Sequence, residues 1–201
     1  MKTKLSVIVC AIFFLFLNIN SNAGGIKVIS GSNSAFANEK VMNIQFDYSS
    51  FSVGKFKTEE EYTSSKVSDY NSKEPGKGDK WLIGWRDARK TKYEPKFEEL
   101  LNKELQDKGI VYGANPSAKY TLTVKITFFE PGYNIGISSK PSYVSYEFIY
   151  AETANPSKEI SKLSLEEVRG ANITGLDFDV TMRVSESFAK GGKMLGNYLS
   201  K

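Results

Sequence analysis

The sequence contains no histidine and a single cysteine, Cys10, among its 201 residues. Without imidazole, a Ser/His/Asp triad, a Cys/His pair and a histidine-ligated metal site are all excluded, and these account for most hydrolase and transition-metal designs. We therefore expect no catalytic residues, no cofactor and no metal, and we expect the protein not to be an enzyme. Packing rather than disulfide bonding must hold its fold together.

The net charge of the chain is also small. The sequence has 27 basic and 23 acidic residues, for a formal net charge of +4. This balance falls to +2 if Lys2 and Lys4 are removed with the leader described below. Such near-neutrality gives no electrostatic footprint for nucleic acid, and the basic residues are mostly lysines, which suit planar phosphate or base recognition less well than arginines. We expect no nucleic-acid partner.

Residues 1–23 have the pattern of a cleaved signal peptide. A short basic start precedes an apolar run over residues 5–17, and small residues lead to a cleavage position at Ala23. A membrane anchor is the alternative, but the run is shorter than the about 20 apolar residues that span a bilayer. Cleavage at Cys10 would leave much of the apolar run attached, so we expect no lipid anchor. The sequence predicts export to the periplasm or the extracellular space.

Periodic spacing of apolar residues predicts the elements of the remaining chain, residues 24–201. Unbroken alternation of apolar and polar residues is typical of a half-buried strand, and it is clearest at Tyr120, Leu122, Val124, Ile126 and Phe128. Further strands are expected at 40–48, 144–150 and 160–165. Spacings of three and four predict amphipathic helices at 95–108 and 180–199. We expect Gly191 and Gly192 to let the second helix pack closely.

Consecutive strands with short connections favour an antiparallel meander. The predicted fold is a single two-layer α+β domain over 24–201, in which an antiparallel sheet of about four strands carries two main helices on one face. Residues 58–80 are expected to form a polar excursion, because a capping-box pattern at Thr58–Glu61 is followed by the turn-rich stretch Glu74–Asp79. Long excursions within compact domains are more often functional or mobile than structural.

This layout resembles that of small exported bacterial cell-envelope proteins. Examples are the lipopolysaccharide-assembly lipoprotein subunit and the amino-terminal domain of the Tol-system propeller protein. The segments that carry the resemblance are 93–109, 120–129, 144–150 and 180–199, and it rests on layout without a specific motif. The resemblance implies a non-catalytic role in envelope assembly or maintenance. The chain departs from these proteins in having no cysteine at the expected mature start to carry a lipid.

Residues 80–92 contain both tryptophans, Trp81 and Trp85, together with Arg86 and Arg89. If the segment is helical, the two indoles share one face, which Arg89 continues. One interpretation is a partner-binding surface, where aromatic rings bury area and basic groups meet acidic groups of a protein or lipid component of the envelope. The other is that both indoles close the core while the basic residues are solvated.

The sequence therefore predicts an exported, non-catalytic adaptor or binding module of the bacterial envelope. The alternative is a periplasmic carrier of a lipid or other apolar ligand, because aromatic residues crowd the predicted meander: Phe128, Phe129, Tyr133, Tyr143, Tyr146, Phe148 and Tyr150. An exposed aromatic sheet face would favour the adaptor, and an enclosed apolar cavity the carrier. A hydrolase using lysine and carboxylates is the third hypothesis, although solvated helix faces and helix starts explain the carboxylate clusters at 59–61, 98–99 and 166–167.

Overall fold

The computed structural model describes residues 25–170 and 180–201, so the expected signal peptide, residues 1–23, lies outside them. Within these ranges the α-helices are α1 (Glu59–Lys73), α2 (Lys77–Ala88), α3 (Glu94–Leu105) and α4 (Val180–Leu199). The short helical segments are η1 (Asn33–Phe36), η2 (Arg89–Tyr93) and η3 (Gln106–Lys108). The strands are β1 (Lys27–Gly31), β2 (Val41–Asp47), β3 (Ser52–Val53), β4 (Val111–Gly113), β5 (Tyr120–Glu130), β6 (Tyr133–Asn134), β7 (Ser139–Lys140), β8 (Tyr143–Glu152) and β9 (Asn155–Arg169).

The prediction of a two-layer fold with an antiparallel sheet of about four strands was wrong. The main sheet has seven strands in the order β1-β9-β8-β5-β2-β4, with β3 also paired to β5, and β6 and β7 form a second sheet. Strand β2 runs parallel to both β4 and β5, whereas β5, β8 and β9 form the expected antiparallel meander. The chain between β2 and β5 passes through three α-helices, and such a crossover returns a strand in the same direction.

A β-bulge in β5 changes which aromatic side chain enters the core. The pairing with β8 shifts register between Ile126 and Phe128. An extra residue reverses the alternation of side chains beyond it. Phe129 is therefore buried, with 2% of its surface exposed, whereas Phe128 is half-buried. The alternation read from the sequence holds up to Ile126 and fails at the next position.

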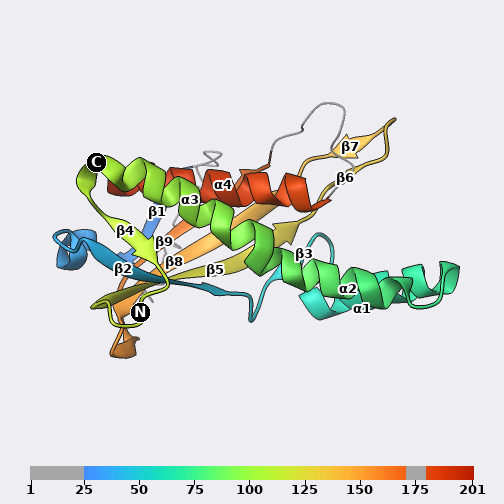
Figure 1. Cartoon of the computed structure of the whole chain (residues 1–201), viewed down its shortest axis with the longest axis horizontal. Helices are drawn as coiled ribbons and strands as arrows, with labels where there is room; N and C mark the ends of the chain where they lie inside the picture. Colours follow the sequence, from blue (N-terminus) through green and yellow to red (C-terminus); the bar gives the residue numbers. More distant parts are fainter. Residues whose placement is uncertain (1–24, 171–179) are drawn as a thin grey trace, which may run out of the picture.

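Helices α3 and α4 confirm the two helices expected at 95–108 and 180–199, and they lie side by side across one face of the sheet (Figure 1). The close packing expected at the glycine pair is also confirmed. A Cβ on Gly192 would lie 2.1 Å from the carbonyl oxygen of Phe97 in α3, and one on Gly191 would lie 2.9 Å from the ring of Tyr146 in β8. The pair thus brings α4 against both the helix and the sheet.

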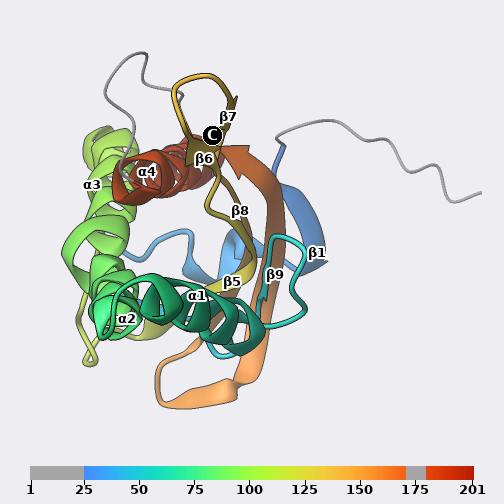
Figure 2. The same cartoon turned by 90° about the vertical axis from the view of Figure 1, so that its right-hand side faces the viewer.

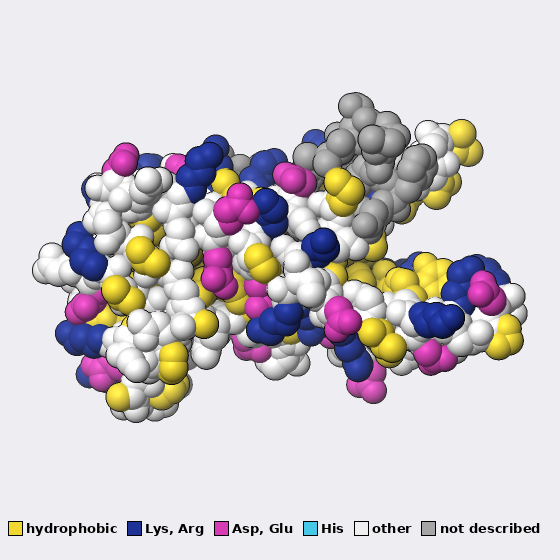
Figure 3. All heavy atoms as spheres, viewed as in Figure 1, with side chains coloured by type: hydrophobic (Ala, Val, Ile, Leu, Met, Phe, Trp, Pro, Cys, Tyr) yellow, Lys and Arg dark blue, Asp and Glu magenta, His cyan; other side chains and the backbone are white. Residues whose placement is uncertain are grey.

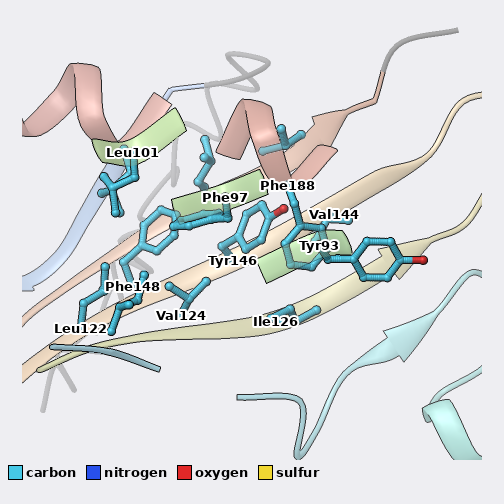
Figure 4. Close-up of a cluster of buried hydrophobic side chains, with 14 of the residues drawn as sticks. Tyr93, Phe97, Leu101, Leu122, Val124, Ile126, Val144, Tyr146, Phe148 and Phe188 are labelled. Atoms are coloured by element: carbon cyan, nitrogen blue, oxygen red, sulfur yellow. The ribbon is translucent and has the colours of Figure 1, made fainter. Parts of the chain in front are cut away.

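The core lies between these two helices and the sheet (Figure 4). Tyr146, Phe148 and Tyr150 of β8 are buried in it. The opposite face of the sheet is polar at β2 and β5, where Asn43 donates to Thr121 and Gln45 donates to Thr123, each at 2.9 Å. Most aromatic residues of the meander thus form the core, and a binding surface has to be sought beyond the sheet.

Candidate functional site

Helices α1 and α2 form a hairpin that projects from the sheet (Figure 1); we call this hairpin, residues 59–88, the arm. The Thr58 hydroxyl begins α1 by accepting a hydrogen bond from the Glu61 amide at 3.1 Å, as the capping-box pattern predicts. Gly78 of α2 lies so close to α1 that a Cβ would come 2.3 Å from a backbone carbonyl oxygen. The polar stretch 58–80 is therefore organised as α1 and the beginning of α2.

Four aromatic side chains, two from each helix, contact one another along the arm, and we call them the aromatic face: Tyr62, Tyr70, Trp81 and Trp85. The two indoles stack with their centroids 5.5 Å apart. Tyr62 lies 6.0 Å from the first indole and 5.2 Å from the second, and Tyr70 lies 5.7 Å from Trp81. Tyr62 and Trp85 are buried, whereas the other two rings are half-buried. The aromatic face thus runs from the core to the surface.

Hydrogen bonding fixes the base of the arm. Trp85 Nε1 donates to Glu59 Oε1 at 2.6 Å, and Arg89 forms an ion pair with the same oxygen. The guanidinium of Arg89 also lies 4.3 Å from the ring centroid of Tyr48. Arg89 begins the π-helical segment η2, which joins α2 to α3 without a break, and π-helical turns are frequent at functional positions. We call Glu59, Trp85 and Arg89 the anchor.

The structure separates the four residues predicted as a partner-binding surface. Trp81 is half-buried at the outer part of the aromatic face, and Arg86 is exposed. Trp85 is buried with 6% of its surface exposed, and Arg89 is held in the anchor. Trp85 therefore helps to close the core, while Trp81 and Arg86 remain candidates for a partner-binding surface.

The anchor leads to a first prediction. Replacing Glu59 by alanine should lower the free energy of unfolding by about 2 kcal/mol, because hydrogen bonds to charged groups contribute about 1.5–3 kcal/mol each and the change leaves the indole N–H unpaired. Urea unfolding followed by tryptophan fluorescence measures this loss. Glu60→Ala is the matched control, since Glu60 lies in the same helical turn and is exposed. Equal losses in the two variants would show that only the charge at the helix start matters.

A second projection lies at the same end of the molecule. Strands β6 and β7 form a hairpin, residues 133–140, which we call the finger. Its tip exposes Ile135 and Ile137, with 64% and 97% of their surfaces accessible. Figures 1 and 2 show the finger and the arm extending toward the same side, and Figure 3 shows hydrophobic side chains along the part of the arm that faces the finger.

Sequence reasoning missed the finger and part of the arm. The sequence analysis predicts no element over residues 133–140, although two isoleucines around Gly136 in a polar stretch are a signal of an apolar tip. Glu59 was assigned to a solvated carboxylate cluster, since its partners lie 26 and 30 residues away in the chain. The tyrosines of the aromatic face are spaced by eight, which places them on one side of a helix.

Three acidic groups, one buried and two with raised pKa values, lie near the anchor. Glu94 Oε2 accepts a hydrogen bond from Lys90 at 2.8 Å, while its other oxygen is buried with no partner among the described residues. Burial, and then the charge of Glu94, raises the pKa of the half-buried Glu98 carboxyl. The same two causes raise the pKa of Tyr48 far above its ordinary range, with burial the larger. The carboxyl of Glu98 and the hydroxyl of Tyr48 therefore lose their protons less readily than they would in water.

Neither a cluster of metal-ligating side chains nor a membrane-spanning helix lies among the described residues. Over 25–170 and 180–201, no group of three His, Cys, Asp or Glu side chains is placed to hold a metal ion. No helix in these ranges is both long enough and apolar enough to cross a bilayer. What the arm and finger do present is apolar and aromatic surface, which suits contact with another molecule.

Comparison with known proteins gives distant structural likenesses. No protein-family model matches the chain, and no curated protein matches it. Among solved structures, the PelC dodecamer from Paraburkholderia phytofirmans is similar at 16% identity and a TM-score of 0.39, covering 86% of this chain and 97% of that one. A variant of the same dodecamer, in another crystal form, is similar at 16% identity and a TM-score of 0.36, covering 83% and 95% of the two chains.

Proposed function

We propose that the chain is an exported, non-catalytic binding module of the bacterial cell envelope, which docks a protein partner between its arm and its finger. The observation that carries this proposal is the exposure of apolar side chains on two separate projections at one end. Ile137 is 97% exposed at the finger tip, and Trp81 is half-buried at the outer part of the aromatic face on the arm. A cluster of exposed apolar side chains on a protein surface marks an interaction site more often than single scattered ones do.

The arm has the properties of a contact surface. Aromatic rings supply much buried area for little loss of side-chain freedom, and tryptophan, tyrosine and arginine dominate binding energies at protein interfaces. Trp81 is held in place by the rings of Tyr62, Tyr70 and Trp85, so docking against it would order few additional groups. Support for the location in the envelope comes from the leader pattern of residues 1–23.

The docking prediction is tested by photo-crosslinking in intact cells. A benzophenone amino acid replaces Ile137 in the full chain, and we expect a discrete adduct with one envelope protein. Trp81→Ala in the same chain should reduce the adduct yield at least about tenfold, because truncation of a central interface tryptophan costs about 2 kcal/mol or more. Arg86→Ala should give a smaller loss, since rim charges mostly affect the rate of association.

Ile83→Ala provides the matched control. Ile83 lies on the same helix two residues from Trp81, on another side, and it is exposed. We expect this variant to keep its adduct. An adduct that persists in Trp81→Ala, or loss of the fold in both the Trp81 and Arg86 variants, would refute docking at the arm. Circular dichroism of each purified variant distinguishes loss of contact from loss of fold.

A further inference from the structure

We infer that a pocket at the opposite end of the molecule from the arm binds a single hydrocarbon chain, such as the acyl chain of a fatty acid or lipid. The pocket has a volume of about 430 Å³ and lies among η1, β2, β4 and the carboxyl ends of α3 and α4. Figure 1 shows this end of the fold at the side marked by the C-terminus, away from the arm. Small-molecule sites typically measure about 300–1,000 Å³.

A large part of the pocket wall is hydrocarbon. Phe36, Met42 and Leu105 line it and are buried, with 5%, 1% and 0% of their surfaces exposed. Ile110 and Leu199 line it as half-buried side chains nearer the surface. Burial of apolar surface against such walls is favourable by about 25 cal/mol for each Å² removed from water.

Several polar groups of the pocket wall already have partners within the protein. The Tyr112 amide donates to Asn102 Oδ1, and the Tyr112 carbonyl accepts from Asn102 Nδ2, both at 2.8 Å. The Tyr112 hydroxyl lies 3.4 Å from that of Tyr150, and Asn33 Oδ1 accepts from Ser161 at 2.9 Å. A polar ligand entering deeply would find these groups occupied and would lose its own hydrogen bonds with water. The buried part of the ligand is therefore apolar.

The pocket is held open by local structure. Segment η1 forms one wall, and the ring of its residue Phe36 stacks on the ring of Tyr150, with the two ring centroids 4.3 Å apart. The side chain of Ser32 caps η1 by accepting a hydrogen bond from the Ser34 amide at 3.2 Å. Glu39 and Lys201 add charged groups to the lining. This arrangement suits a chain whose apolar tail enters and whose polar head stays in water.

The inference goes beyond the proposed function and is tested by fluorescence titration of the purified chain with dansyl-labelled undecanoic acid. We expect saturable, one-to-one binding that unlabelled fatty acids displace. Each added CH2 in the displacing acid should tighten its binding by about fourfold until the pocket is filled. No saturation, or displacement that is independent of chain length, would overturn the inference.

Substitution by tryptophan locates the site. Ile110→Trp fills the pocket and should weaken binding at least about tenfold, a difference of about 1.4 kcal/mol. Ile149→Trp is the matched control, because Ile149 is also a half-buried isoleucine but lies on β8 and does not line the pocket. Equal weakening in the two variants would overturn the assignment. Circular dichroism checks both folds, and the chain-length series keeps the test decisive if Ile110→Trp does not fold.

The same variants separate this inference from the proposed function. Trp81→Ala should bind the dansyl probe as tightly as the unchanged chain, because Trp81 does not line the pocket. Ile110→Trp should retain the photo-crosslink from the finger, since Ile110 lies outside the arm and the finger. Failure of one site therefore leaves the evidence for the other intact.

Discussion

Replacing Gly192 by alanine is expected to lower the free energy of unfolding by about 3 kcal/mol, the upper part of the range for overpacking a core. A Cβ at this position would lie 2.1 Å from the carbonyl oxygen of Phe97, which belongs to the backbone of α3 and cannot rotate away. Helix α4 would have to move off α3 to admit one methyl group. The gain of about 1 kcal/mol in helix propensity from glycine to alanine offsets only part of this cost.

Gly84→Ala measures the effect of helix propensity on stability without the close contact. Gly84 lies within helix α2, and a Cβ there would meet nothing within 4 Å. The same chemical change should therefore raise the free energy of unfolding by up to about 1 kcal/mol. Urea unfolding of both variants measures the two effects. A Gly192 variant as stable as the unchanged chain would mean that the two helices do not pack as closely as the structure shows.

The glycine pair and the helix that carries it were predictable because their signal is local. Apolar residues spaced by three and four along 180–199 define one face of a helix whatever it packs against. Two adjacent glycines within such a face cost stability unless a neighbour comes close, which is the observed reason for Gly191 and Gly192. Local periodicity thus yielded both the helix and the manner of its packing.

The sheet was not predictable to the same extent, because strand pairing depends on distant parts of the chain. Strand β2 has a pattern that suits parallel and antiparallel pairing alike, and only the helical crossover determines its direction. Strand β4 has three residues and β3 has two, too few to show alternation. The bulge in β5 adds one residue without any change in composition, so the burial of Phe129 in place of Phe128 could not be foreseen.

The candidate site was likewise predictable only where its signal is local in the sequence. The segment with Trp81 and Arg86 was found from composition alone, since two tryptophans one helical turn apart are conspicuous. The anchor was not found, because Glu59 and Arg89 come together only when the arm folds back on itself. Contacts between residues that are 30 positions apart leave no trace in a local pattern.

Phe129→Ala is expected to have the largest effect of these substitutions, lowering the free energy of unfolding by about 3–5 kcal/mol. The ring of Phe129 connects the arm to the core. Its centroid lies 5.1 Å from that of Trp85, 6.1 Å from that of Tyr93 and 6.5 Å from that of Phe188. Truncation leaves a cavity among three aromatic rings that are themselves held by other contacts and cannot collapse into it.

Phe128→Ala provides the control, since it removes the same ring from the adjacent, half-buried position. We expect this variant to lose much less stability, because water can occupy the space that the ring leaves. Urea unfolding measures both losses, and tryptophan emission in a Trp81→Phe background reports on Trp85 at the base of the arm. Because Trp85 loses its contact with Phe129, its emission should shift to longer wavelength in Phe129→Ala alone. Equal losses in the two variants would mean that β5 lacks the bulge, and an unchanged emission would mean that the arm is held by Glu59 without support from the core.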